Sequence, residues 1–226
     1  MSLLAFCDGA VAVGMPGAQD HKRVNDGDLG LNTGGMGAYA PAPVLTPALR
    51  KEAMGVCQAT VNAMASEGTP YKGVLYAGLM IGPPNPSNPK APRVRLVEFN
   101  CRFGDPETQV VLPLLQSDLF DVMAACVLGT LASTRVEWAP SGTFAATVVA
   151  AAGGYPEAYA KGSPITLTPP PSGSLLAQSS TVYHAGTKVG LTTICSFFFH
   201  YNNFLVTSSA YSCFFLSISF LCLVRW

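Results

Sequence analysis

The amino-acid sequence predicts an α+β fold whose strands pair in antiparallel fashion. Strand-like and helical segments come in a mixed order: a hairpin, a loop, a helix, two strands, a helical region and a further strand. The strands predicted at 71–81 and 93–99 are joined by a proline-rich loop with no helix between them. A parallel doubly wound sheet would instead alternate strands with crossover helices, so this order favours α+β.

The chain begins with a predicted hairpin. Leu3 to Cys7 is an apolar run, Asp8-Gly9 is a typical hairpin turn, and Ala10 to Val13 is a second apolar run. Residues 17–40 follow; they are polar and contain six glycines. That composition predicts a long loop with a demanding backbone path.

A helix is predicted from Pro47 to Ser66. Thr46 is a suitable N-cap, proline is favoured at the first helical position, and Gly68 follows the last turn. The amphipathic pattern predicts a buried face made of Leu49, Ala53, Val56, Ala59 or Thr60, and Ala63 or Met64.

The remaining elements follow from apolar patterns. Residues 71–81 and 93–99 are strand-like, and the five prolines between them forbid regular pairing there. Residues 108–115 and 117–128 are expected to be helical, the second with Ser117 as N-cap, and new strands begin at Trp138.

Composition and charge limit the classes of protein to which the chain can belong. The 226 residues suffice for one large domain or two small ones, and 13 basic residues balance 13 acidic ones. A neutral chain lacks the positive surface of a nucleic-acid-binding protein. All 13 acidic residues precede residue 162, and only Lys188 and Arg225 are charged after it. The C-terminal part is therefore unlike the rest of the chain.

The spacing of the cysteines and the N-terminal segment indicate in which cellular compartment the protein is expected. The seven cysteines are odd in number and widely spaced, without a CxxC pair, which argues against a disulfide framework or a zinc cluster. The first apolar run has no basic residue before it and is interrupted by Asp8, so no signal peptide is predicted. We expect a cytoplasmic protein, or one of the plastid stroma if an upstream transit peptide is missing.

The glycine-rich segment GLNTGGMG at 30–37 is a candidate anion-binding loop. It has methionine where a Walker loop requires lysine, and it lacks the dinucleotide-binding glycine pattern. Its backbone amides can still approach an anion, with Asn32 and Thr33 as side-chain donors. Lys22 and Arg23 lie just upstream, and cations beside free amides are typical of phosphate sites. A solvated surface loop is the alternative.

The segment VEFNCRFGDPE at 97–107 has the highest density of side chains that could bind a metal ion or a phosphate. Side chains alternate along a strand, so Glu98, Asn100 and Arg102 share one face. Glutamate and asparagine offer the oxygen ligands that Mg²⁺ uses beside water and phosphate, and arginine binds carboxylate or phosphate. The opposite face is expected to be half-buried through Val97, Phe99 and Cys101. A solvent-facing polar edge is the alternative.

Several motifs together resemble one family. They are QDHKR at 19–23, NTGGMGAY at 32–39, YAGLM at 76–80, EFNCRFGDPETQ at 98–109, AAGGYPEAY at 151–159 and HAGTK at 184–188. The sequence closely resembles the phosphoribosylamine–glycine ligases, also called glycinamide ribonucleotide synthetases, which are ATP-grasp enzymes of purine biosynthesis. The similarity is nearly continuous from about residue 2 to residue 188.

The resemblance implies a reaction and its participants. In this family ATP phosphorylates the carboxylate of glycine, and the amine of 5-phosphoribosylamine attacks the glycyl phosphate to give glycinamide ribonucleotide, ADP and phosphate. Mg²⁺ or Mn²⁺ would be bound by Glu98 and Asn100, and Arg102 and Lys22 would act in catalysis. The residues implied for substrate and ATP-phosphate binding are Arg23, Asp28, Asn32, Thr33, Gly34, Gly35, Gly37, Asp105 and Glu107.

The same resemblance implies a domain organisation. Residues 1–134 would form the C-terminal half of an ATP-grasp domain, with an antiparallel sheet and packed helices, and 135–188 part of a small β-rich domain. Residues 189–226 depart from the family, and residues 204–224 carry no charge. Three interpretations of this tail stay open: a membrane tail anchor, a buried core segment, or an aberrant end of the coding sequence.

Two alternative functions remain beside the ligase. Family enzymes are about twice as long, and the parts that hold adenine precede the strand with which this chain starts. We therefore expect no turnover by the chain alone, which would make it an inactive fragment; a tail-anchored membrane protein is the other alternative. The sequence leaves the oligomeric state open.

Overall fold

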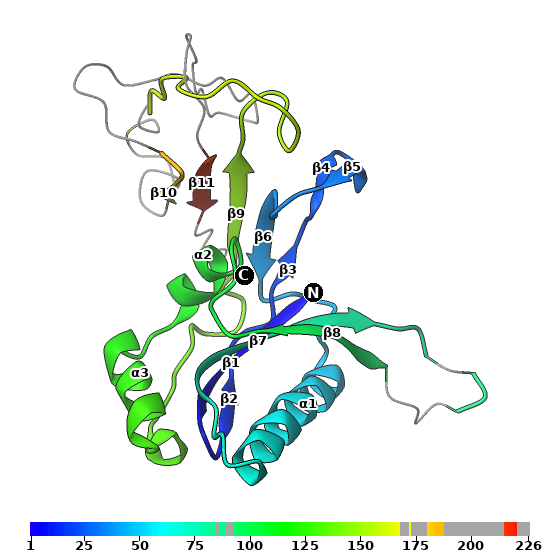
Figure 1. The fold of residues 1–226 in the computed structure, drawn as a ribbon, viewed down its shortest axis with the longest axis vertical. Helices are drawn as coiled ribbons and strands as arrows, with labels where there is room; N and C mark the ends of the chain where they lie inside the picture. Colours follow the sequence, from blue (N-terminus) through cyan, green and yellow to red (C-terminus); the bar gives the residue numbers. More distant parts are fainter. Residues whose placement is uncertain (85, 89–92, 168–171, 173–179, 188–214, 221–226) are drawn as a thin grey trace.

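The computed structural model of the chain describes residues 1–84, 86–88, 93–167, 172, 180–187 and 215–220. Its strands pair in antiparallel fashion and are covered by helices, as the α+β prediction required. Figure 1 shows the two principal sheets, one in the lower half of the view and one above it.

The first sheet has four strands in the order β2-β1-β7-β8. Their bounds are β1 (Ser2–Asp8), β2 (Ala12–Gly14), β7 (Lys72–Ile81) and β8 (Val94–Asn100). β1 and β2 form the hairpin that the Asp-Gly turn predicts, with Cys7 opposite Ala12. β7 and β8 form the predicted second pair, which confirms antiparallel pairing across the proline-rich loop.

β1 is the centre of the core because all seven of its residues are buried. Its odd-numbered side chains, from Leu3 onward, pack with α1 (Pro47–Ser66). Leu4 and Phe6 point to the other face, where α3 (Leu119–Leu128) packs. The sheet is thus enclosed between α1 and α3 (Figure 1), and burial on both faces explains a strand without polar alternation.

α1 begins as predicted, but its buried face differs from the prediction. The hydroxyl of Thr46 accepts a hydrogen bond of 3.4 Å from the amide of Leu49. The buried residues are Leu49, Ala53, Cys57 and Val61, of which the first two were predicted. The other predicted positions are half-buried (Val56 and the alternatives Thr60 and Met64) or exposed (Ala59 and Ala63). Because a helix turns about 100° per residue, steps of four residues give a stripe that drifts around the axis and follows the twisted sheet.

The second helical region is more broken than predicted. It consists of α2 (Thr108–Val111), the 3₁₀ turn η1 (Leu112–Leu114), α3 and the 3₁₀ turn η2 (Leu131–Ser133). The N-cap of α3 is Asp118, whose carboxylate accepts from the amide of Phe120 at 2.7 Å. Ser117 was the wrong choice because its hydroxyl bonds to the backbone of Arg135 and Glu137 instead.

Residues 17–40 are not the plain loop that their composition predicts. They form β3 (Gln19–Asp20), β4 (Arg23–Asn25), β5 (Leu29–Asn32) and β6 (Gly37–Ala40). β4 and β5 make a two-stranded hairpin of their own. β6 pairs with β9 (Ala145–Ala150), more than a hundred residues further on. Pairing with so distant a partner leaves no local pattern in the sequence.

The second sheet has the order β10-β11-β9-β6-β3, with β10 (Ser180–Ala185) and β11 (Phe215–Phe220). It combines strands from both sides of residue 134, so the division of the chain there stays a prediction. The interpretations of the tail concern mainly residues 189–214 and 221–226, which lie outside the described residues. Within the described part of the chain, no helix has the length and apolar character needed to cross a membrane.

Candidate active site

The candidate site is built on the exposed end of the β7–β8 pair. Tyr76 lies opposite Asn100, and Gly78 lies opposite Glu98. Residues directly opposite in an antiparallel pair project from the same face of the sheet. A Cβ atom on Gly78 would lie 3.3 Å from Cγ of Glu98, so glycine at this position leaves room for the glutamate.

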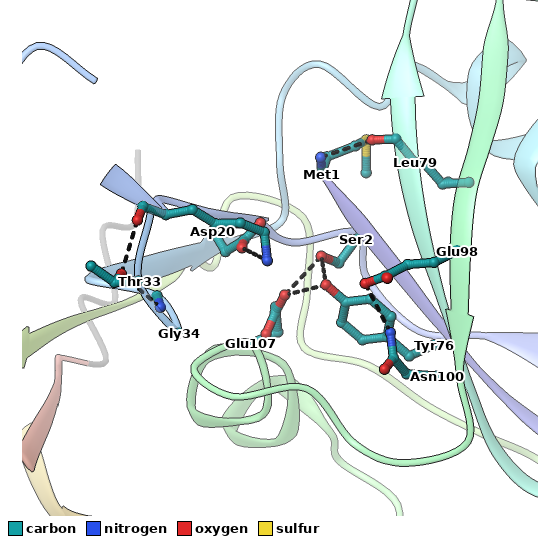
Figure 2. A network of polar contacts seen from close by, with 12 residues as sticks. Met1, Ser2, Asp20, Thr33, Gly34, Tyr76, Leu79, Glu98, Asn100 and Glu107 are labelled. Carbon is teal, nitrogen blue, oxygen red and sulfur yellow. Dashed lines mark hydrogen bonds and ion pairs between the residues drawn. The ribbon is translucent and has the colours of Figure 1, made fainter. Parts of the chain in front are cut away.

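The predicted row of acid, amide and guanidinium is present in the structure. Nδ2 of Asn100 donates to Oε1 of Glu98 at 3.1 Å, and Arg102 donates to Oδ1 of Asn100 at 3.4 Å. Figure 2 shows Glu98 and Asn100 side by side at the end of β8. The three groups therefore converge: Glu98 and Asn100 through strand alternation, and Arg102, which lies beyond the end of β8, through its hydrogen bond to Asn100.

The opposite face of β8 agrees with the prediction only in part, because Phe99 is half-buried whereas Val97 and Cys101 are exposed. Phe99 packs against the core under α1, as expected. Val97 is 65% exposed because the register shifts by one residue at this point, between Gly78 and Leu79. A bulge leaves one residue of the strand without an opposite partner, and this irregularity could not be read from the alternation of residue types.

Lys22 connects the polar loop to the carboxylates. Its ammonium forms an ion pair of 2.9 Å with Asp20. Burial by itself disfavours the charged form, but the hydrogen bond and charge of Asp20, with the charges of Glu107 and Glu98, outweigh it and raise the pKa of Lys22. The structure thus pairs this cation with Asp20, and the charges of Glu107 and Glu98 favour its protonated form.

The glycine loop is packed onto the turn that follows β8. A Cβ atom on Gly35 would lie 2.5 Å from Cδ of Pro106, and one on Gly37 would lie 2.6 Å from the carbonyl oxygen of Thr147. Gly35 also has φ +132°, which side chains rarely adopt. The loop and the strand end, predicted separately, are therefore in contact.

The amides of this loop are not free in the structure, contrary to the prediction. The amide of Gly34 donates to the hydroxyl of Tyr155 at 3.1 Å, and that of Gly35 donates to Oγ1 of Thr33 at 3.0 Å. The amide of Met36 donates to the carbonyl of His21 at 2.7 Å. A loop held in place by tertiary packing satisfies its own amides, so an anion would have to replace one of these acceptors.

Three other predicted residues lie on the β4–β5 hairpin. Arg23, Asp28 and Asn32 are exposed there, and the hairpin extends beyond β3 and β6 in Figure 1. The guanidinium of Arg23 donates to the carbonyl of Gly30 at 2.6 Å across the hairpin. Their proposed part in phosphate binding therefore stays a prediction, because the structure does not place them in the row on β8.

Asp105 and Glu107 have contrasting surroundings. Asp105 is exposed and accepts a hydrogen bond from Gln109. Glu107 is buried, and its Oε1 atom accepts from Ser2 at 2.8 Å and from Tyr76 at 2.7 Å (Figure 2). The sequence reasoning missed Ser2 and Tyr76. The signal was a hydroxyl at the edge of, or within, an otherwise apolar strand.

The oxygen donors on β8 suit a magnesium ion. Within the part of the chain that the structure describes, no three His, Cys, Asp or Glu side chains gather as a metal site. The side chains of Glu98 and Asn100 carry neighbouring oxygen atoms that could serve as two ligands, and Mg²⁺ commonly takes one or two from the protein and the others from water and phosphate. The donor set thus fits Mg²⁺ or Mn²⁺ bound together with a phosphate.

An apolar cavity elsewhere is unsuited to that role. It has a volume of about 360 Å³ and lies between Pro41, Leu114, Trp138 and Pro140. No charged side chain lines it. A phosphate group would find no cation in this cavity.

Comparison with known proteins identifies related sequences. Residues 1–108 match the family described as phosphoribosylglycinamide synthetase, ATP-grasp (A) domain. A phosphoribosylamine–glycine ligase of Synechocystis is 47% identical over 191 residues, which cover 84% of this chain and 42% of that protein. The chain thus spans about two fifths of the length of that relative.

Solved structures agree with this result. The crystal structure of the phosphoribosylamine–glycine ligase of Thermotoga maritima is similar at a TM-score of 0.66 and 30% identity, over 96% of this chain and 47% of that one. The biotin carboxylase domain of a Hydrogenobacter thermophilus 2-oxoglutarate carboxylase has a TM-score of 0.53 at 12% identity, over 98% of this chain and 41% of that one. The second likeness concerns the fold alone.

Proposed function

Since residues 1–108 match the family of phosphoribosylglycinamide synthetase ATP-grasp domains, we propose that this chain supplies the metal- and phosphate-binding part of a phosphoribosylamine–glycine ligase. Its substrates would be ATP, glycine and 5-phosphoribosylamine. The observation that carries the proposal is the hydrogen-bonded row Glu98–Asn100–Arg102. The charge of Glu98 acts on Lys22, and the turn that follows the row packs against the glycine loop.

The reaction needs positioning and charge neutralisation rather than a covalent intermediate. An oxygen of the glycine carboxylate takes the γ-phosphoryl group of ATP, and ADP leaves. The amine of 5-phosphoribosylamine then attacks the acyl carbon; the C–N bond forms, the C–O bond to phosphate breaks, and the amine loses a proton. Such transfers depend on cations aligned with the phosphoryl oxygens.

Each residue of the row has a part in this scheme. Glu98 and Asn100 would hold Mg²⁺ or Mn²⁺, which when bound neutralises phosphate charge. Arg102 is exposed and anchored to Asn100, so its remaining donors can bind the carboxylate of glycine or the acyl phosphate. Lys22 stays charged beside the carboxylates and would contact a phosphate of ATP.

Metal binding by the full chain is the direct test. Mn²⁺ binding in the presence of ADP can be followed by electron paramagnetic resonance. We expect Glu98→Gln to weaken Mn²⁺ binding about tenfold or more, because one of two protein ligands loses its charge. Glu137→Gln is the matched control, since Glu137 forms a surface ion pair with Arg135. Equal Mn²⁺ affinity of Glu98→Gln and the wild-type chain would rule out this metal site.

A further inference from the structure

Ser2, Tyr76 and Glu107 form a buried polar cluster below the row on β8. Oγ of Ser2 and the hydroxyl of Tyr76 are 2.7 Å apart, and each also bonds to Oε1 of Glu107. The exposed fractions are 1% for Ser2, 6% for Tyr76 and 2% for Glu107. The three residues come from the start of β1, the middle of β7 and the N-cap of α2, so the cluster joins three separate elements.

The turn after β8 is shaped around this cluster. A Cβ atom on Gly104 would lie 2.5 Å from Oε2 of Glu107 and 2.8 Å from Cε2 of Tyr76. A side chain at this position would therefore force the carboxylate of Glu107 or the ring of Tyr76 to shift. The path of the turn from Arg102 to Pro106 and the position of Glu107 are therefore coupled through packing.

The cluster also places a charge close to the site. A buried carboxylate is costly unless it is hydrogen-bonded and compensated by a cation. The two hydroxyls supply the hydrogen bonds, and the ammonium of Lys22, which is paired with Asp20 at 2.9 Å, lies within electrostatic reach of Glu107. Figure 2 shows Glu107 between Asp20 and the ring of Tyr76.

Tyr76 additionally connects the cluster to the row on β8. It is opposite Asn100 in the strand register, and its ring borders both Gly78 and Gly104. Burial, and after it the charge of Glu107, raise the pKa of Tyr76 despite the hydrogen bond with Ser2, so the hydroxyl keeps its proton and donates it. A phenylalanine would fill the same space without holding Glu107.

We infer that Ser2 and Tyr76 are positioning residues: they hold Glu107 so that its charge orients the Lys22 ammonium and its packing sets the Gly104–Pro106 turn beside Arg102 for contact with phosphate. This inference rests on the proposed function, because it assigns a purpose to the same phosphate site. It concerns the two cations that would contact phosphate and leaves the metal ligands on β8 untouched.

The test separates metal binding from phosphate binding. Mn²⁺ affinity is measured by electron paramagnetic resonance, and ADP affinity by calorimetry with Mn²⁺ at saturation, on the full chain. We expect Tyr76→Phe and Glu107→Gln to weaken ADP binding about tenfold while Mn²⁺ affinity changes less than about twofold. Tyr71→Phe is the control, because it also removes a tyrosine hydroxyl. That hydroxyl donates to the carbonyl of Val74 in β7.

The outcomes are distinct. If Tyr76→Phe binds ADP like the wild-type chain, the inference is wrong while the proposed function stands. If the Mn²⁺ and ADP affinities of the variants fall together, the cluster only supports the fold, and the inference is wrong in this case too. If Glu107→Gln does not fold, Tyr76→Phe, which removes a single oxygen atom, decides alone. A wild-type chain that binds Mn²⁺ but not ADP refutes the inference, and one that binds neither refutes the proposed function as well.

Discussion

The carboxylate of Asp8 should contribute strongly to stability, and Asp8→Asn tests this. Asp8 is buried, and its Oδ1 atom accepts from the amides of Ala10 and Val11, both at 2.9 Å. Its Oδ2 atom accepts from the amide of Leu131 at 3.0 Å, which joins the first hairpin to the end of the helical region. Asparagine has the same shape, but its NH₂ group must face at least one of these donors.

The expected loss follows from these three bonds. One buried amide loses its acceptor, which costs about 1–3 kcal/mol, and the remaining bonds lose the assistance of the charge. We expect the free energy of unfolding to fall by roughly 2–3 kcal/mol at neutral pH. Asp118→Asn is the control, because Asp118 caps α3 on the surface and asparagine caps equally well, so its loss should be about 0.5 kcal/mol or less.

The pH dependence gives a second readout. The backbone hydrogen bonds from Val11, Ala10 and Leu131 outweigh burial and lower the pKa of Asp8. A carboxylate with a lowered native pKa stabilises the fold above its unfolded pKa, and this stability is lost as the pH falls through the native value. The difference between wild type and Asp8→Asn should therefore be greatest at neutral pH and shrink below about pH 4.

Urea unfolding followed by circular dichroism measures both effects. The slope of the unfolding free energy against urea should be unchanged, so that the difference lies in the midpoint. If Asp8→Asn costs no more than Asp118→Asn, or if its deficit does not change with pH, then the buried carboxylate does not act as described.

Two further predictions concern the glycine loop and the thiols. Gly35→Ala should destabilise the fold by roughly 1–3 kcal/mol, because its Cβ would meet Pro106 and its φ is +132°, whereas Gly34→Ala, with its nearest contact at 3.7 Å, should be nearly neutral in urea unfolding. Equal losses for the two variants would contradict this packing. Iodoacetamide should alkylate the exposed Cys101 in the native chain well before Cys7, whose pKa burial raises to about 12. Peptide mass spectrometry that found both modified at one rate would refute the difference.

Local patterns in the sequence were sufficient for some of the fold. The hairpin at Asp8-Gly9, the helix begun by Thr46 and the antiparallel pair formed by β7 and β8 follow from turn chemistry, capping and periodicity. Glu98 and Asn100 follow in the same way, because strand alternation puts both side chains on one face, whereas Arg102 lies beyond the end of β8 and joins them through its hydrogen bond to Asn100. Interactions between residues close in sequence leave a readable local pattern.

Other features depend on partners far apart in the chain. The pairing of β6 with β9, the use of the loop amides by Tyr155 and Thr33, and the bulge that exposes Val97 have no signature in their own segments. The same is true of Ser2, Tyr76 and Glu107, which are spread over 105 residues and meet only when β1, β7 and α2 are packed. By itself the sequence determined which groups could perform phosphate chemistry. The tertiary structure decided which of them are buried, hydrogen-bonded and held in place, because burial and packing arise only when distant segments exclude water together.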